Sequence, residues 1–495
     1  MISQLVKKLL RRSGYAILAL VALLAVFILE ENLRGRILLA HYKSELRTKG
    51  EKLTLAEIDV PHTPTDGNGA PALLEAANEL DALVRANYSQ IFDLVQPEYV
   101  EPGKVVVWHR EQLIPPVSRR EERGHRPGRY AAWKLDWDGL AAAVVSTKPV
   151  VARVKLALQQ PEFGMEVDYS KVFEIELPNR AAVDNLTRWL SVSTLSALHN
   201  RDREAALDSI TTLAKLAACP LNRQLMRAQV ARARLCEMGL QVTWEALQDD
   251  GWTDNQLLQM QQAWQSTDLI SDLPKVVEVQ RAIDLLAWEK VTHWPSFIEI
   301  TGSQRISWGS IIWGVWKVMW KSQDESRFLQ MWELKSEFLR NVTASTAAYV
   351  PYQKLWDLKY GGNGNLYYNL PHLYSQMFFG YMTCDVPTII RCETRRHMTL
   401  AAIALQRYQN STGHPPSDLN ALVPSYLSVL PHDYMDGKTL KYRVNPGGTW
   451  TLYSVGEDGV DNGGSLERSN LYVSKMWDTR DAVWPQAAVK APTER

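Results

Sequence analysis

Oxygen-bearing side chains gather near the C-terminus, in and just after a glycine-rich loop. Asp458, Asp461 and Asn462 lie in the sequence GEDGVDNGG, and Asp478 and Asp481 follow in WDTRDAVW. Calcium takes about six to eight oxygen ligands from carboxylates, amides and carbonyls, so these residues predict a structural calcium site. The alternative is a solvated turn of Asp, Asn and Gly that needs no ion.

The cysteines offer a second kind of chemistry. Cys384 and Cys392 are eight residues apart, and in an oxidising compartment they predict a disulfide. Cys219 and Cys236 fall in apolar helical segments, where we expect buried thiols. The four cysteines contain no CxxC pair, which excludes a cysteine-based zinc module.

Signatures of catalysis are missing from the sequence. It contains no GxSxG nucleophile elbow, no HExxH zinc motif, no phosphate-binding P-loop and no GxGxxG dinucleotide motif. We therefore assign no catalytic residues and favour a protein that is not an enzyme. The alternative is an envelope hydrolase without a recognised motif, which a deep pocket lined by convergent acids or histidines would support.

Composition narrows the class of protein further. The 495 residues include 55 basic and 55 acidic side chains, so the formal net charge is zero. Without a long basic run, the chain is not expected to bind nucleic acid, which requires clustered Lys and Arg. Hydrophobic residues make up 46% of the chain, enough to form a sizeable core.

An uncharged apolar run of sixteen residues, Gly14–Leu29, predicts a membrane-spanning helix. Such a helix usually needs about 17–25 residues, and Leu9 and Leu10 supply the missing length if the arginines reach back to the headgroups. Glu30 and Glu31 follow the run, whereas four cations precede it: Lys7, Lys8, Arg11 and Arg12. This asymmetry predicts a single-pass protein of a bacterial inner membrane, with its N-terminus cytoplasmic and its bulk periplasmic.

A cleaved signal peptide is the alternative, because its apolar region measures about 7–15 residues. The small-x-small pattern of a cleavage site is absent after Leu29, where Glu30, Glu31 and Asn32 follow. We therefore favour an uncleaved anchor.

Apolar residues at helical spacing dominate the middle of the chain. Residues 182–247 carry two apolar stripes separated by the polar sequence His199-Asn-Arg-Asp, which predicts a helical hairpin. It resembles the unit of a tetratricopeptide-type solenoid, without a sustained 34-residue period. Further helices are expected over 30–56, 72–95, 254–270 (with Asp254 as N-cap), 274–293 and 323–345. Short strands or extended loops are expected at Lys104–Trp108 and Val167–Leu177.

Tryptophans cluster in the sequence SWGSIIWGVWKVMWK. Helical spacing puts Trp313, Trp316 and Trp320 on one face. One interpretation is an interfacial helix at the bilayer surface, with Lys317 and Lys321 near the headgroups. The other, which we favour, is a buried helix, because apolar residues also cover the remaining faces.

The C-terminal region predicts a small α+β lobe. A helix is expected over 391–409 and is broken near Gly413. Two strands, Leu440–Val444 and Thr449–Val455, are joined by Asn445-Pro-Gly-Gly, which supplies the glycine that a tight hairpin requires.

This region, about 391–464, resembles the periplasmic lobe of the major pseudopilin of type II secretion systems. The matching residues are Tyr408, Gly413, Pro416, Leu419, Leu422, Tyr426, Leu427, Pro431, Tyr442, Tyr453, Ser454, Gly456, Asp458 and Gly459. The resemblance implies calcium in the last loop, with Asp478 or Asp481 matching aspartates near the family's C-terminus. The whole chain is also similar to envelope proteins of planctomycete or verrucomicrobial type, in the SVGEDGVD loop and the tail Asp481-Ala-Val-Trp484-Pro485.

Two departures from the pseudopilin pattern stand out. Pseudopilins carry a glutamate at the fifth position of the mature apolar helix, whereas here YAILALV follows Gly14 and the first acid is Glu30. A helical region of roughly 360 residues also separates the apolar helix from the lobe. Both argue against assembly into a pilus-like filament.

We expect a mainly α chain in four parts: an anchor at 1–30, membrane-proximal helices with short strands at 31–180, a helical domain at 181–390 and the lobe at 391–495. The favoured function is a binding or scaffold role in the envelope, with the lipid bilayer and other envelope proteins as partners. The alternative is a component or partner of a type II secretion or pilus-like apparatus.

Overall fold

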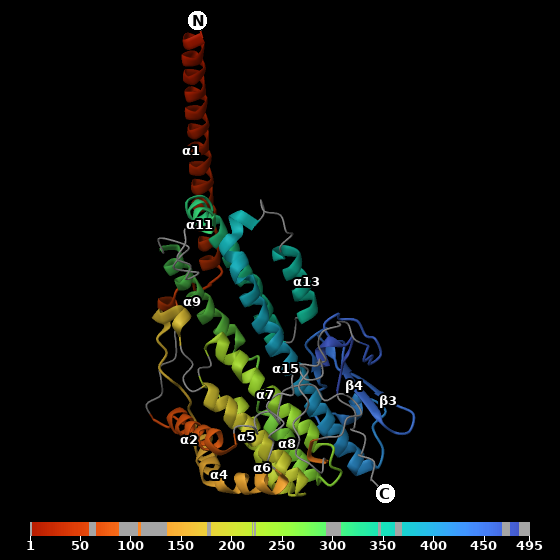
Figure 1. Ribbon diagram of the computed structural model, residues 1–495. Coiled ribbons are helices and arrows are strands. Elements are labelled where there is room, and N and C mark those ends of the chain that lie inside the picture. Colours follow the sequence, from red (N-terminus) through yellow and green to blue (C-terminus); the bar gives the residue numbers. More distant parts are fainter. Residues whose placement is uncertain are drawn as a thin grey trace.

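The computed structural model shows a helical body from which one long helix projects (Figure 1). It describes residues 2–58, 66–88, 107–109, 136–175, 180–219, 221, 224–293, 308–344, 348–361, 369–467 and 476–484. The chain is mainly helical with a small C-terminal sheet region, which confirms the expected fold class at that level.

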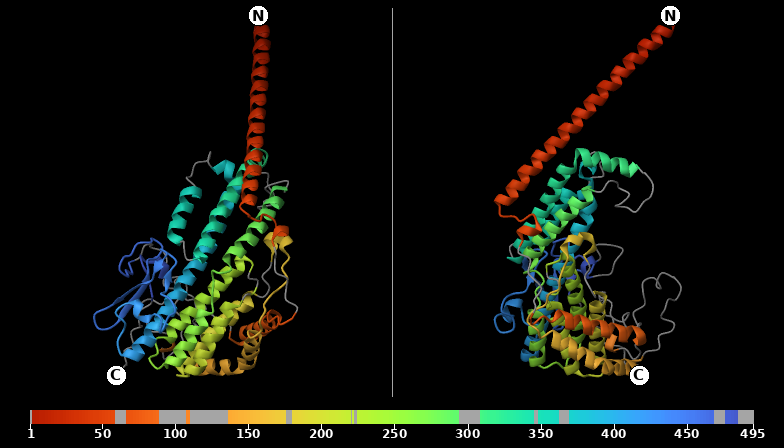
Figure 2. Two further views of the ribbon diagram at one scale, coloured as in Figure 1. Left: turned by 180° about the vertical axis from the view of Figure 1, so that it is seen from behind. Right: turned by 90° about the vertical axis from the view of Figure 1, so that its left-hand side faces the viewer.

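Helix α1 (Ile2–Thr48) is one uninterrupted helix of 47 residues. From Arg11 onward it contains a stretch long and apolar enough to cross a membrane, and that stretch is wholly exposed. Its N-terminal part extends away from the body in every view (Figures 1 and 2). The expected anchor and the expected helix after it are therefore one element, which ends at Thr48 rather than near residue 56.

The body is a stack of helices that run between the end where α1 leaves and the opposite end, where α2, α4 and α6 lie (Figure 1). Helix α5 packs on α6 and α7, and α15 packs on α7, α8 and α12. Their bounds are α2 (Ala70–Tyr88), α4 (Trp137–Ala157), α5 (Arg180–His199), α6 (Arg203–Ala218), α7 (Met226–Ala246), α8 (Asp254–Gln265), α9 (Leu273–His293), α11 (Trp308–Met319), α12 (Lys321–Thr343), α13 (Tyr349–Tyr360) and α15 (Leu373–Thr412).

The predicted helical hairpin is confirmed as α5 and α6. The break falls at Asn200–Asp202, where Arg201 has a positive φ of 56° and the Asp202 carboxylate caps α6 by accepting a hydrogen bond from Ala205 N. The polar residues that interrupt the apolar stripe therefore end one helix and begin the next.

Three expected element boundaries need correction. The N-cap of α8 is Thr253 rather than Asp254, because Thr253 and Gln256 form a reciprocal capping box. The described parts of the two segments expected as short strands or extended loops contain 3₁₀ turns, Val107–His109 and Tyr169–Glu174; the second is capped by Asp168, whose carboxylate accepts from Ser170 N. Residues 104–106, 176–177 and 89–95 of these predictions lie outside the described residues.

The expected C-terminal hairpin is confirmed as β3 (Lys441–Val444) and β4 (Trp450–Ser454), which pair antiparallel with Lys441 opposite Tyr453. Gly447 and Gly448 both have positive φ in the turn, which is why the sequence there needs glycine. Strand β5 (Ala482–Val483) pairs with β4, and a separate two-stranded ladder joins β1 (His432–Asp433) to β2 (Lys438–Thr439).

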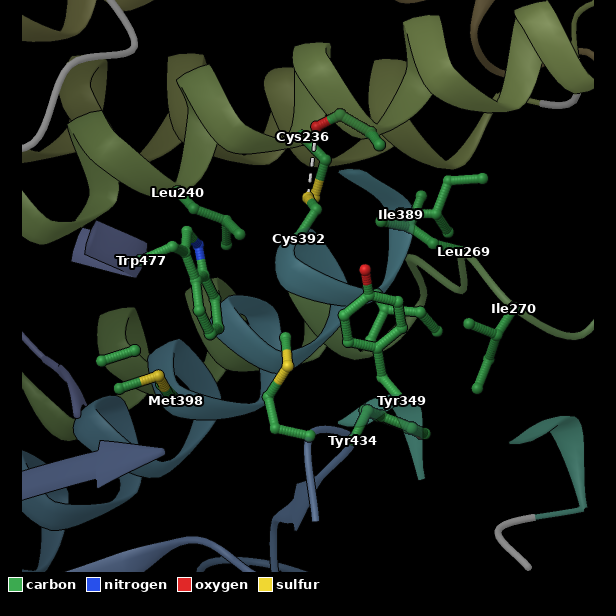
Figure 3. Close-up of a cluster of buried hydrophobic side chains, with 14 of the residues drawn as sticks. Cys236, Leu240, Leu269, Ile270, Tyr349, Ile389, Cys392, Met398, Tyr434 and Trp477 are labelled. Atoms are coloured by element: carbon green, nitrogen blue, oxygen red, sulfur yellow. Dashed lines mark hydrogen bonds between the residues drawn. The ribbon is translucent and has the colours of Figure 1, made fainter. Parts of the chain in front are cut away.

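Helix α15 runs without a break through residue 390, where a domain boundary was expected. Its buried side chains share one continuous core with α7 and with the sheet region. In Figure 3, Met398 of α15 belongs to the same buried cluster as Leu240 of α7 and the lobe residues Trp477 and Tyr434. The lobe is therefore packed into the body through its own helix.

Helices α7 and α8 approach closely at a glycine. A Cβ on Gly239 would lie 2.6 Å from Cη2 of Trp264. The Trp264 ring is fully buried and its Nε1 donates to Thr243 Oγ1 at 3.0 Å, so the ring is not free to move away. The contact requires a residue without a side chain.

We predict that Gly239→Ala lowers the free energy of unfolding by about 1–3 kcal/mol, because it overpacks this contact. The matched control is Gly314→Ala on α11, where a Cβ would meet nothing within 4 Å. Both substitutions gain about 1 kcal/mol of helix propensity, so their difference isolates the clash. Denaturant unfolding of the full chain in detergent measures both, and equal stability of the two variants would contradict the close packing.

Candidate functional site

At the end of the body where α1 leaves, a network of polar contacts is centred on the second half of α1. We call residues 31–48 the stem; it packs along α12. Gly35 permits the close approach, since a Cβ there would lie 2.9 Å from Cγ of Gln323. The Tyr42 hydroxyl donates to Glu333, and Lys43 pairs with Glu325. These contacts fix the rotation of the stem about its own axis.

A buried carboxylate lies just beyond the C-terminal end of the stem. Glu51, just after α1, accepts from Arg281 of α9 at 2.7 Å and from Arg340 of α12 at 2.5 Å, and a second Arg281 nitrogen donates to the Lys52 carbonyl. Burial alone would raise the pKa of Glu51, but hydrogen bonds and charge from both arginines outweigh it and lower the pKa. One charged group therefore ties three helices together.

A cleft of about 640 Å³ opens between the stem, α12 and α13. Its lining carries both signs of charge, from Arg34, Arg327 and Lys359 on one hand and Glu333 and Glu337 on the other. The remaining lining residues are Leu38, Tyr42, Gln323, Ser326, Gln330, Leu334, Tyr360 and His372. Such a lining suits a polar ligand or peptide segment that carries both charges.

The cleft residues are not arranged as an acid–base pair. Burial and the charge of Arg327 lower the pKa of His372 to about 4, so this ring is neutral near pH 7. Glu333 is held by Lys49 and Tyr42, and these contacts lower its pKa although burial alone would raise it.

A buried charge cluster lies between α9, α12 and α15. Lys335 Nζ donates to both oxygens of Asp385, at 2.8 and 2.9 Å, and Gln280 donates to Asp284 Oδ1 at 2.8 Å. The second oxygen of Asp284 is buried without a hydrogen-bond partner among the described residues, and burial raises the pKa of Asp284 to about 7. These charged residues do not line the cleft, so we interpret them as part of the packing.

The predicted calcium ligands are placed in and around the loop after β4. Asp481 is fully buried and accepts backbone N–H groups of Asn462, Gly464 and Ser465. Asp461 accepts from the Tyr453 hydroxyl and Gly463 N, and Asp458 from Val460 N and the Asn462 side chain. Asp478 ends a 3₁₀ turn (Met476–Asp478).

This arrangement does not form a cation cage. Within the described ranges, no group of three or more His, Cys, Asp or Glu side chains is placed to hold a metal ion. The Asp481 carboxylate instead closes the loop by accepting its backbone N–H groups, as in a turn that needs no ion. Calcium stays a prediction, and we derive no step from it.

The predicted disulfide is not formed in this structure. Cys384 and Cys392 both lie in α15, and eight residues of helix separate their Cα atoms by about 12 Å, whereas a disulfide needs about 4.4–6.8 Å. Cys392 is a free buried thiol that donates to the Ala233 carbonyl of α7 at 3.1 Å (Figure 3). Cys219 and Cys236 are buried and form no disulfide, as predicted.

The sequence analysis missed the Glu51 contact. Glu51 and Arg281 are 230 residues apart, so no local spacing reveals the pair. The available signal was the position of Arg281 inside the apolar run VVEVQRAIDLLAW, because a charge on the buried face of a helix requires a partner.

We predict that Glu51→Gln destabilises the protein by about 3 kcal/mol, because it leaves the buried guanidinium of Arg281 without its carboxylate. The control is Glu45→Gln, which removes an exposed pair with Lys49 and should cost at most about 1 kcal/mol. Denaturant unfolding of both variants tests this. Equal effects would mean that the buried pair has no special role.

We predict that Asp284→Asn flattens part of the pH dependence of stability. A carboxyl pKa raised by folding favours the folded state only while the group is protonated, so this contribution is complete at low pH and lost as pH rises towards about 7. The wild type should lose up to about 1.4 kcal/mol per pH unit relative to the variant between roughly pH 4 and 7. Unfolding at several pH values, with exposed Asp250→Asn as control, measures the difference. Parallel profiles for wild type and Asp284→Asn would contradict the prediction.

Comparison with known proteins adds no family to this description. No protein-family model matches the chain, and neither a curated protein nor a solved structure matches it.

Proposed function

We propose that this chain is a single-pass, membrane-anchored binding or scaffold protein of a bacterial envelope. The observation that carries the proposal is that one continuous helix, α1, combines an exposed apolar stretch with a stem docked on the body. Exposed apolar side chains along that stretch include Leu18, Leu20, Val21, Leu23, Leu24 and Val26. A face this apolar is unfavourable in water and favourable in lipid.

The continuity of α1 supports retention of the anchor over cleavage. Glu31 sits where a signal peptide would be cut, and it is already engaged by the body: Gln323 donates to it at 2.7 Å and Trp320 at 3.2 Å. The cations before the apolar run support the proposed orientation, with the N-terminus in the cytoplasm and the body in the periplasm.

The stem cleft is the binding surface in this proposal. It lies beside the anchor, so its ligand would be held close to the bilayer. Its mixed charges suit a polypeptide segment with both acidic and basic side chains, which a neighbouring envelope protein could supply.

A role in a secretion or pilus-like apparatus is the second candidate. The order of a long helix, a short 3₁₀ segment (Leu419–Leu422) and an antiparallel hairpin agrees with the order expected from the pseudopilin resemblance. Against filament assembly, the lobe's helix is α15, which is packed inside the body, while the anchor is a separate helix.

Topology is tested with reporters fused to the C-terminus of the full chain. We expect the alkaline phosphatase fusion to be active and the green fluorescent protein fusion not to fluoresce. The protein should also stay in the membrane fraction during carbonate extraction. The reverse reporter pattern would overturn the orientation. Release of the protein by carbonate would overturn the anchor.

Binding is tested by photo-crosslinking from defined positions in cells. A crosslinker at Gln330 or Glu337, both exposed and lining the cleft, should give a discrete adduct. The control is Asn255, exposed on α8 far from the stem. Mass spectrometry of the adduct then separates the candidates: a pseudopilin or secretin would support the apparatus, and another envelope protein the scaffold. Equal labelling from Asn255 would contradict the cleft as the binding surface.

A further inference from the structure

Helix α11 presents two apolar faces to different surroundings. Its inner face is buried: Trp313, Trp316 and Met319 are at most 6% exposed. Its outer face is not covered by the described residues, among which Ile312, Val315 and Val318 are 37%, 43% and 54% exposed. Gly314 on the same side has nothing within 4 Å of its Cβ position.

The inner face is held firmly. Trp316 Nε1 donates to the buried carboxylate of Asp324 at 2.9 Å, and the Trp316 ring stacks on Trp313 at 4.6 Å between centroids. Trp288 and Tyr374 complete the aromatic cluster, with their rings 4.2 Å apart. Because this cluster fixes the rotation of α11, the outer face cannot turn inward to bury its valines.

The outer face lies at the level where the apolar part of α1 ends. Asn32 donates its side-chain N–H to the Val318 carbonyl, and α1 and α11 are in contact there. Asn32 follows Leu29 by three residues, about 4.5 Å along a helix. Each interfacial layer of a bilayer is about 5–7 Å thick, so a membrane crossed by α1 would place Val318 inside that layer.

Charge at this level fits the same surroundings. Arg34, Lys317 and Lys321 lie on the adjoining turns of α1, α11 and α12 and can reach lipid phosphates. Figures 1 and 2 show α11 at the end of the body from which α1 projects.

We propose that α11 is a membrane-interface helix whose outer face, Ile312, Val315 and Val318, lies in the headgroup–acyl boundary beside α1. It seats the body on the bilayer and places the stem cleft next to the lipid headgroups. This inference rests on the proposed anchoring by α1. The two interpretations of the tryptophan-rich segment then apply to opposite faces of one helix.

The test uses full-length protein in nanodiscs of phosphatidylcholine and phosphatidylglycerol. Single cysteines at Val315 and Val318 carry an environment-sensitive fluorophore, in a Cys384→Ser background because the other three native thiols are buried. Lipids brominated near the headgroup serve as quenchers. The control is Val145→Cys, a valine 59% exposed on α4 at the far end of the body. Leu24→Cys on α1 reports the anchor itself.

We expect quenching at 315 and 318 to be several-fold stronger than at 145. Val318→Asp should abolish most of the quenching at 315, and its thermal melting should match the wild type because the residue is exposed. If the label at position 24 is quenched while those at 315 and 318 are quenched no more than the control at 145, the proposal of an interface helix is wrong and the proposed anchor is supported. If 24 is not quenched, the proposed anchoring itself fails. If the fluorophore at position 315 reports a buried environment that depends on protein concentration and not on lipid, the outer face would instead bind a second copy of the chain.

Discussion

The structure depends on one constraint: α1 is a single helix whose two halves lie in different surroundings. An uninterrupted helix transmits orientation, so the contacts of the stem determine how the body is held relative to the exposed half. Gly14 and Gly35 are the glycines of α1, and Gly35 is used for close packing on Gln323. The hydrogen bond from Tyr42 to Glu333 and the ion pairs of Lys43 with Glu325 and of Glu51 with Arg340 then select one register of the stem on α12.

Buried charge plays a similar part deeper in the body. Apolar helices as long as α9, α12 and α15 could slide past one another at small cost in buried area. The Lys335–Asp385 pair and the Trp316–Asp324 hydrogen bond each tolerate one alignment only, because a shifted helix would leave a buried polar group unpaired. Burial raises the pKa of Asp324 to about 7 even though it accepts three hydrogen-bonding N–H groups, which shows how strongly this part of the core disfavours charge. These groups specify the arrangement more than they stabilise it.

Short-range sequence patterns predicted the turns and helix ends that short-range interactions determine. The glycines after Asn445 specify the β3–β4 turn, and the polar residues after His199 separate α5 from α6. Contacts between distant residues left no such pattern. Asp481 was predicted as a calcium ligand from its residue type, but its carboxylate reaches back 16 to 19 residues to backbone N–H groups. The Cys384–Cys392 prediction failed because a helix continued where the sequence suggested a boundary, and the stem cleft was not predicted because its walls come from three separate parts of the chain.

The tryptophans illustrate why composition alone is ambiguous. Among the described residues, the largest fully buried side chains include Trp189, Trp244, Trp264, Trp288, Trp313, Trp316, Trp332 and Trp356, so the high tryptophan content mainly fills the core. The spacing of Trp313 and Trp316 correctly marked one face of α11, whereas Trp320 lies in the turn to α12 and donates to Glu31 of the stem. From the sequence alone, an apolar residue on the opposite face of α11 looks the same whether protein or lipid covers it. What distinguishes cover by protein from cover by lipid is the position of α11 beside the end of the apolar run of α1. In a bilayer crossed by α1, this position would bring the outer face, which no described residue covers, to the membrane surface.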